Sequence, residues 1–531
     1  MMSVVALALG LVVADARVLT LDPEHPAARH VAIVGGRFTY VGDDLAAAKK
    51  AAGDEPKVLD AFGATMLPGF NDAHVHFGLS LTIGADEAVD LGDGPRDRAT
   101  LDKVIRRAAA QPIGTDIHDW VFIISRSLPS DVKSSGDLPP ITRPVFIVTE
   151  HGGLLSAIAQ KRLHLGEEDA PRGQVRGRLL PATLDLIVKS LPMNVLRAGA
   201  RHFLAQLAKL GLTSVQLMDE LPEVFESLRT EGALTARVRM IAFGYRFDTD
   251  QYAPAWRPPE PQLVQLDAVK YFHDDWARLP RLELKRIYED SQRTGRPVVL
   301  HVLSRFALRS LVEQLERLEA KLPGGAKYFR IDHADDVTPE LASRVQRLGV
   351  MVCSNPSMLP EWHAAKAFPM HTLLKAGVSL CMGSDWVGVH KPARPLAPLF
   401  GLQMAVTHGG YGVEEQISVD DALVAFTRGS ALGEGRTDLG QIRVGALADA
   451  VGLSADPHEV PPDQLSALEV RFTIMDGKVV YQRRQPGLGA PLPPSIGPAG
   501  SPEPHAPNRP PPTIGPAGPP VDNPKILDTK K

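Results

Sequence analysis

The stretch Pro68-Gly-Phe-Asn-Asp-Ala-His-Val-His76 directly follows a short apolar run, Ala64–Leu67. In an extended chain, residues two apart point to the same side, so the imidazoles of His74 and His76 can converge on one ion. A His-x-His pair also arises by chance. Its meaning therefore depends on what the rest of the chain places beside it.

Short apolar, β-branched runs recur along the chain and alternate with helix-like segments, which is typical of a parallel sheet with crossover helices. The first run is Ala64–Leu67 with its extension to His76, and the other seven are Leu212–Met218, Val238–Phe243, Leu266–Phe272, Pro297–Leu303, Tyr328–Ile331, Val350–Cys353 and Val378–Met382. Eight strands close a (β/α)8 barrel. We therefore predict an α/β fold built on a (β/α)8 TIM barrel.

Two hairpins far apart in the sequence predict a second, smaller β domain. Val31–Val41 contains Gly35-Gly36 where a tight turn needs positive φ, and Phe472–Tyr481 repeats the pattern with Asp476-Gly477. An isolated hairpin is marginally stable in water, so we expect a small β-sandwich domain built from both chain ends. The predicted divisions are 1–66 for the first part of the sandwich, 67–435 for the barrel with an insertion at about 80–205, and 436–484 for the second part of the sandwich.

The final segment, residues 485–531, has a different composition from the rest of the chain. It is dense in Pro and Gly and contains a near repeat, Ser495–Gly500 and Thr513–Gly518. Such a composition cannot bury enough apolar surface to order itself, so we expect a disordered or extended tail without a catalytic role.

Overall charge and cysteine content exclude several classes of protein. Lys and Arg number 58 against 62 Asp and Glu, a formal charge of −4, which argues against a nucleic-acid-binding surface. The two cysteines, Cys353 and Cys381, each lie in an apolar run and cannot form a disulfide framework. We expect buried free thiols and no nucleic-acid partner.

The amino terminus, Met1–Val13, is apolar and is followed by Ala14-Asp-Ala16, which resembles a signal-peptide cleavage site. It lacks a basic segment, and cleavage would remove part of the predicted strand Leu11–Leu21. No other run approaches the roughly 18 apolar residues of a membrane span. We therefore predict a cytoplasmic protein without a membrane partner, with export as the less favoured alternative.

Side chains that bind metals recur at the carboxyl ends of the predicted strands, the face at which such barrels place their active sites. Lys270 lies in the fourth strand, His301 in the fifth, His333 follows the sixth and Asp385 follows the eighth. A single histidine that ends an apolar strand is more often a core residue, and Asp385 could simply cap the next helix. Together with the His-x-His pair, however, these residues predict a metal site, because neutral imidazole is a common ligand of zinc and similar ions.

Lys270 and Asp385 suggest the chemistry of this site. An ammonium beside metal cations would be repelled, whereas the neutral amine of a buried lysine can add carbon dioxide and become a carbamate that bridges two ions. We therefore expect a carboxylated Lys270. Asp385 is the candidate catalytic residue, a carboxylate that touches the metal and shuttles the proton of the attacking water.

Five segments together resemble those of a known family: the motif at 68–76, the Val-Lys pair at Lys270, His301, Arg330-Ile-Asp-His333 and Gly383-Ser-Asp385. This family is the amidohydrolase superfamily. The resemblance is to its YtcJ-like branch (amidohydrolase family 3), which includes N-substituted formamide deformylases. Asp438–Asp449 is similar to the segment by which these chains re-enter the sandwich. The resemblance implies a metal-dependent hydrolase with two divalent ions, zinc being the expected element. Its implied ligands are His74, His76, carboxylated Lys270, His301, His333 and Asp385.

The surroundings of these ligands differ from the family pattern. Val302–Arg305 stands where Ala-x-Gly-Asp is usual, His273-Asp274-Asp275 replaces an Asp-Gly pair, and His151–Ser156 lacks the usual Trp-Val-Asn-Ser. The resemblance therefore covers the metal site and does not extend to a particular substrate. His151, Trp276 and Trp386 are the candidate substrate contacts.

The predicted function is hydrolysis of a C–N bond in a small amide, N-formyl or N-acyl, by a metal-bound hydroxide with Asp385 as proton shuttle. The alternatives are an ester or lactone hydrolase with the same site, a single-metal deaminase, and a non-enzymatic, degenerate ligand-binding barrel. We expect a small-molecule substrate and a possible homo-oligomer. No nucleophile elbow, P-loop or dinucleotide fingerprint supports other chemistry.

Overall fold

The computed structural model describes residues 10–483, except positions 84, 86, 112–118, 150–151, 178, 245–262, 276, 363–367, 389–394 and 411. Two of the candidate substrate contacts, His151 and Trp276, lie outside the described residues, as does the tail 485–531. The expectations for them remain predictions.

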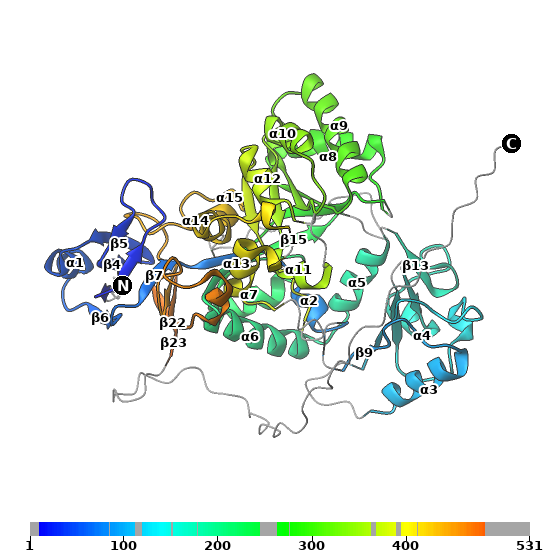
Figure 1. The fold of residues 1–531 in the computed structure, drawn as a ribbon. Coiled ribbons are helices and arrows are strands. Elements are labelled where there is room, and N and C mark those ends of the chain that lie inside the picture. Colours follow the sequence, from blue (N-terminus) through cyan, green and yellow to red (C-terminus); the bar gives the residue numbers. More distant parts are fainter. Residues whose placement is uncertain are drawn as a thin grey trace, which may run out of the picture. The chain divides into compact units, whose positions relative to one another are not determined.

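Figure 1 shows the fold of the chain. The largest sheet has eight parallel strands whose order in space follows the sequence. The strands are β8 (Phe70–Val75), β14 (Leu212–Leu217), β15 (Arg237–Phe243), β16 (Val264–Phe272), β17 (Val298–Val302), β18 (Phe329–His333), β19 (Met351–Ser354) and β20 (Leu380–Met382). Each strand pairs in parallel with the next barrel strand along the chain, with register shifts between β8 and β14 and between β15 and β16. The predicted TIM barrel is confirmed.

The barrel closes between its first strand and the segment after its last. The backbone N–H of Asp385 donates to the carbonyl of His74 at 2.8 Å, and the N–H of His76 donates to the carbonyl of Trp386 at 3.0 Å. Gly383 permits this approach, because a Cβ there would lie 2.6 Å from the backbone nitrogen of His74. Closure therefore brings the His-x-His motif against Asp385.

Capping residues and the spacing of apolar side chains explain why the barrel helices form, as α9 (Arg305–Lys321) illustrates. Ser304 caps it by accepting a hydrogen bond from the N–H of Ala307, and one face is buried at three- and four-residue spacing, at Leu308, Leu311 and Leu315. The other helices between and after the barrel strands are α2 (Phe77–Ser80), α7 (Pro222–Thr230), α8 (Arg281–Thr294), α10 (Pro339–Arg347), α11 (Leu359–Trp362), α12 (Met370–Lys375), α13 (Pro398–Thr407), α14 (Val419–Val424) and α15 (Ser430–Gly433).

The first predicted barrel run, Ala64–Leu67, does not belong to the barrel. This stretch forms β7 (Thr65–Pro68), which pairs with β2 and β21 in another sheet. The chain changes sheets at Gly69, whose N–H donates to the carbonyl of Asp449 and whose missing Cβ would lie 2.0 Å from Oγ1 of Thr213. Glycine at this crossing ends one strand and lets the barrel begin at Phe70.

A β-sandwich is built from both chain ends, as predicted. One sheet has the order β5-β4-β1-β6 and the other β23-β22-β21-β7-β2-β3. Their strands are β1 (Leu11–Ala14), β2 (Arg17–Leu19), β3 (Ala27–Ala28), β4 (His30–Val34), β5 (Arg37–Gly42), β6 (Lys57–Asp60), β7, β21 (Ala450–Leu453), β22 (Val470–Met475) and β23 (Lys478–Gln482), with α1 (Leu45–Ala52) beside the first sheet. Ile33 and Phe38 from the first sheet share one buried core with Phe472 and Ile474 from the second.

Between β8 and β14 the chain forms a further sheet of five strands, in the order β13-β12-β11-β10-β9. Its elements are β9 (Val89–Asp90), α3 (Arg98–Ala109), β10 (Val121–Ile124), β11 (Val145–Thr149), β12 (Gly152–Leu155), α4 (Ala157–Arg162) and β13 (Gln174–Arg176). Leu101 and Ile105 of α3 pack on Val121 and Ile123 as a separate core. The predicted domain boundaries themselves remain predictions.

Two helices, α5 (Leu179–Lys189) and α6 (Met193–Lys209), lead from this sheet back to β14. No single helix among the described residues is long and apolar enough to cross a membrane. The two helices taken together have sufficient length and apolar composition, but they are bent by 101° relative to each other.

Cys353 and Cys381, paired in register on β19 and β20, are buried free thiols, as predicted.

Candidate metal centre

The His-x-His motif lies at the carboxyl end of β8, where side chains alternate between the barrel interior and its outside. His74 is fully buried within the strand, and His76 follows the strand with 13% of its side chain exposed. The two Nε2 atoms are 3.1 Å apart. Both imidazoles therefore point to one place, as the spacing predicts.

Asp385 completes a compact group of donors with these two histidines. Its Oδ1 lies 3.2 Å from Nε2 of His76 and 3.4 Å from Nε2 of His74. One ligand atom from each residue falls within 4.8 Å of the others. Asp385 has a φ of 50°, a left-handed conformation uncommon outside glycine that clusters at functional sites.

His301 and His333 stand beside this group, at the ends of β17 and β18. Their ring centroids are 4.4 Å apart with the rings nearly perpendicular, and the His333 ring is 5.1 Å from that of His74. Asp274, after β16, lies with Oδ2 3.8 Å from Nε2 of His301 and accepts a 2.8 Å hydrogen bond from the N–H of Leu303. The fifth and sixth strands thus add two imidazoles to the same site.

Lys270 reaches the centre of the cluster from β16. Its Nζ lies 3.0 Å from Nε2 of His74 and 3.5 Å from Oδ2 of Asp332, and the side chain is 1% exposed. Burial lowers the pKa of Lys270 from its usual value. The structure therefore brings all six residues predicted as metal ligands together.

Burial keeps the imidazoles of His74 and His333 uncharged. Burial, with a smaller contribution from the Lys270 ammonium, lowers the pKa of each to about 3. Neutral nitrogens are the form that binds a metal. Nδ1 of His333 is also buried and makes no hydrogen bond to any residue that the structure describes. A set of imidazoles, a carboxylate and a buried amine fits zinc-like divalent ions.

Beneath His74 lies a buried charged pair that the sequence analysis assigned no role. Oδ2 of Asp332 is 2.9 Å from Nδ1 of His74, and Nε of Arg330 donates to Oδ1 of Asp332 at 2.8 Å. Arg330 also donates to the carbonyl of Ala73 and to the side-chain oxygen of Gln216. The sequence does contain a sign of this pair, because Arg330 and Asp332 are charged residues at alternate positions of an otherwise apolar barrel strand.

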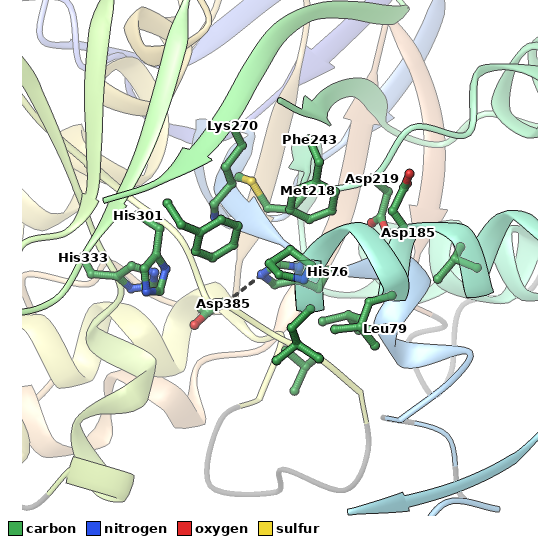
Figure 2. A pocket seen from close by; sticks show the side chains of 16 residues that line it. His76, Leu79, Asp185, Met218, Asp219, Phe243, Lys270, His301, His333 and Asp385 are labelled. Atoms are coloured by element: carbon green, nitrogen blue, oxygen red, sulfur yellow. Dashed lines mark ion pairs between the residues drawn. The ribbon is translucent and has the colours of Figure 1, made fainter. Parts of the chain in front are cut away.

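A cavity of about 260 Å³ opens on the site and is lined by five of the six candidate ligands (Figure 2). Most of the remaining lining is apolar: Leu79, Leu180, Pro181, Leu184, Val188, Met218, Phe243, Phe272 and Val387. Two acidic residues, Asp185 and Asp219, complete it. The cavity suits a small, largely apolar molecule.

Trp386, the remaining candidate substrate contact, lies away from this lining. Its ring stacks on Phe203 of α6 with centroids 5.7 Å apart, and its neighbour Val387 lines the cavity instead. Asp185 and Asp219 were not predicted as part of the site. They come from α5 and from the end of β14, and no short motif marks them.

The comparisons with known proteins agree with this architecture. The model of the Amidohydrolase family matches residues 57–481. The chain is 24% identical to an N-substituted formamide deformylase of Arthrobacter pascens, over 89% of this chain and 98% of that protein. It is 23% identical to the putative amidohydrolase YtcJ of Bacillus subtilis, over 82% and 92%.

Solved structures share the fold at low sequence identity. An uncharacterized metal-dependent hydrolase from Pyrococcus horikoshii aligns with a TM-score of 0.64 and 20% identity, over 85% of this chain and 99% of that one. A mutant atrazine chlorohydrolase from Arthrobacter aurescens, complexed with zinc and atraton, aligns at 0.55 and 16%, over 90% and 97%. The family match runs from β6 into β23. This chain therefore belongs to the amidohydrolase family and is a hydrolase.

Proposed function

We propose that this enzyme hydrolyses a C–N bond of a small amide, with N-formyl and N-acyl amines as the substrate class. The observation that carries the proposal is Asp385, whose Oδ1 lies within 3.4 Å of both imidazoles of the His-x-His pair while its side chain lines the cavity. The similarity to a formamide deformylase supports the choice of bond.

Six residues would hold the metal. His74, His76 and Asp385 form one group of donors, and His301 with His333 forms a second, so the site suits two divalent ions, with zinc as the expected element. Bound divalent cations lower the pKa of a water molecule and polarise a carbonyl oxygen.

Lys270 lies between the two groups, and we propose that it carries a carbamate. Its amine would add to the carbon of carbon dioxide, forming an N–C bond and releasing one proton. The product is a carboxylate on a long side chain. Burial among imidazoles favours the neutral amine that this addition requires, and Nζ lies 3.0 Å from Nε2 of His74.

The chain's own residues perform the proton transfers. Asp385 takes a proton from the attacking water as the new C–O bond forms at the carbonyl carbon. It then gives this proton to the leaving nitrogen as the C–N bond breaks, which yields a carboxylic acid and an amine. Asp332 keeps the proton of His74 on Nδ1, so that Nε2 faces the site. The apolar lining limits access of bulk water.

One observation favours a second candidate, a single-metal deaminase. The tightest set of donors contains only His74, His76 and Asp385. Three protein ligands with an open position are sufficient for a catalytic zinc ion. In that case Lys270 would act as an unmodified amine.

Metal analysis combined with a substrate panel tests the proposal. We expect about two zinc ions per chain and hydrolysis of N-formyl or N-acyl amines in preference to aryl esters. About one ion per chain, together with release of ammonia from an amino-substituted ring, would favour the deaminase. Faster turnover of aryl esters would favour the esterase. A protein that binds no zinc and turns over none of these compounds contradicts the proposal.

A further inference from the structure

Asp219 occupies an unusual position in the cavity. It follows β14 and α2 packs against it, and the residue is only 5% exposed although it lines the cavity. Figure 2 shows Asp219 and Asp185 close together at one end of the group, with His76 between them and the pair His301 and His333. The two carboxylates thus lie apart from the catalytic donors.

The carboxylate of Asp219 is only half satisfied. Oδ1 accepts a hydrogen bond from the N–H of Gly78 at 3.0 Å. Oδ2 is buried and has no hydrogen-bond partner among the residues that the structure describes. A buried oxygen in this state is energetically unfavourable, so such groups are rarely left without a partner. A ligand in the cavity can supply one.

The nearby ammonium group is already engaged elsewhere. Nζ of Lys189 lies 2.8 Å from Oδ2 of Asp185 and 2.6 Å from Oε2 of Glu220. One cation therefore serves two carboxylates, and Asp219 adds a third. Apart from Lys270, no described residue that lines the cavity carries a positive side chain. Two carboxylates, those of Asp185 and Asp219, thus line this end of the cavity.

The environment of Asp219 disfavours its charged form. Burial, together with the neighbouring Asp185 carboxylate, raises the pKa of Asp219 to about 7, although the Lys189 ammonium acts in the opposite direction. A cation placed against Oδ2 would favour the ionised form, because opposite charges at contact distance stabilise each other strongly at a buried site.

Apolar side chains line the rest of the cavity. Leu184 and Val188 come from α5, Met218 directly follows β14, and Phe243 ends β15. A hydrocarbon chain is the chemistry that such walls accept. A substrate with an amide at one end, a hydrocarbon middle and a cation at the other end matches the three parts of the cavity.

We propose that Asp219 binds a positively charged group of the substrate, so that the preferred class is a mono-N-acylated aliphatic diamine whose free end is an ammonium group. This inference rests on the proposed amide hydrolysis and specifies its substrate. Asp219 acts as a specificity residue and takes no part in the bond-breaking steps.

Three matched N-formyl substrates test the proposal on the zinc-loaded full-length enzyme. They are mono-N-formylated diaminohexane, N-formylheptylamine, in which a methyl group replaces the ammonium, and the N-formyl derivative of aminohexanol. We expect kcat/KM for the ammonium compound to exceed that for the other two by about 10- to 100-fold, the range of a hydrogen bond to a charged group. A ratio near one for either neutral compound overturns the proposal.

The Asp219→Asn variant should remove this preference. Asn keeps an oxygen for the Gly78 N–H but loses the charge, so kcat/KM should fall for the ammonium compound and change by less than about threefold for N-formylheptylamine. The matched control is Asp290→Asn, which removes a carboxylate paired with Arg293 near the end of α8, and the preference should remain. A preference retained in Asp219→Asn overturns the proposal. Should that variant fail to fold, the wild-type ratios decide.

Calorimetry separates this proposal from the proposed reaction, because it needs no turnover. Wild-type enzyme should bind heptylamine, which carries an ammonium group, at least about tenfold more tightly than 1-heptanol, which has none, and Asp219→Asn should bind both equally. If no formamide is hydrolysed, the proposed function fails while the binding result still decides the role of Asp219. Equal binding of the two compounds by the wild type overturns that role.

Discussion

Oδ2 of Asp332 lies 2.9 Å from Nδ1 of His74, and both side chains are completely buried. A carboxylate at this distance favours the tautomer with the proton on Nδ1, which leaves the other nitrogen of His74 to face the metal centre. Arg330 holds the same carboxylate through Nε at 2.8 Å. The first predicted ligand is therefore fixed by a buried ion pair on the sixth strand.

Asp332→Asn should weaken metal binding by about 10- to 100-fold, since an amide orients the imidazole less well than a carboxylate. Competition between the apoprotein and a chromophoric chelator measures the zinc Kd. Asp267→Asn is the control, because it breaks a carboxylate–guanidinium pair with the buried Arg239 in which the carboxylate is partly exposed. A zinc Kd unchanged in Asp332→Asn would show that Asp332 does not position His74.

Asp385→Asn should leave most of the metal bound while lowering kcat by about 100- to 10,000-fold, because the amide cannot accept the proton of water. Metal content by plasma emission spectroscopy and single-turnover rates on an N-formyl amine measure both effects. Unchanged turnover would remove Asp385 from the proton-transfer role, and complete loss of metal would make it chiefly a ligand.

Lys270→Ala should reduce the zinc content from about two ions per chain to about one, because the proposed bridge between the donor groups is lost. Wild-type protein reconstituted with labelled bicarbonate should give a carbamate carbon signal in NMR spectra that the variant lacks. The absence of that signal from active wild-type enzyme would contradict carboxylation and favour the single-metal reading.

Gly383→Ala should destabilise the protein by about 1–3 kcal/mol, since the new Cβ would lie 2.6 Å from the backbone nitrogen of His74. Urea unfolding of the apoprotein gives the difference in unfolding free energy. Gly295→Ala is the matched control, because its Cβ meets no atom within 4 Å and only its φ of 72° is unfavourable. A loss no greater than that of the control would mean that the backbone adjusts at Gly383.

His458 should stabilise the fold in mildly acidic solution. Partial burial lowers the pKa of His458, but hydrogen bonds from its two ring nitrogens to Asp420 and Asp456, at 2.9 and 2.7 Å, outweigh burial and raise the pKa above 6.5. The charged form is favoured in the folded state. Its contribution is therefore fully present below the unfolded pKa and is lost as the pH rises through the folded pKa. His458→Gln should lower the unfolding free energy more at about pH 5.5 than at about pH 8.5. An equal loss at both pH values would contradict this role.

The barrel and the six candidate ligands could be predicted from the sequence, because both depend on short apolar strands and on the residues that directly follow them. A ligand such as His301 ends an apolar strand, and parallel strands in sequence order bring their carboxyl ends to one face. The change of sheets at Gly69 was missed, because Ala64–Leu67 is as apolar as a barrel strand and only the close approach of Thr213 explains the break.

The charged residues around the ligands could not be found in the same way. Asp219 and Asp185 meet through the packing of α5, which comes from the segment between the first two barrel strands and has no periodic relation to them. Trp386 follows the predicted ligand Asp385 in the sequence and was therefore a candidate substrate contact. In the structure its ring instead stacks on Phe203 of α6, a tertiary contact that the sequence does not reveal.

The pairing of β7 with β21 sets the order in which this chain can mature on the ribosome. Leu67 pairs with Val451, about 380 residues later in the chain, so β7 can pair early with β2 but gains its second neighbouring strand only after residue 451 has emerged. At roughly 5–20 residues per second, that interval is about 20–80 s. During this time one edge of β7 lacks its partner strand, and the sandwich joins only once its two halves have both been synthesised.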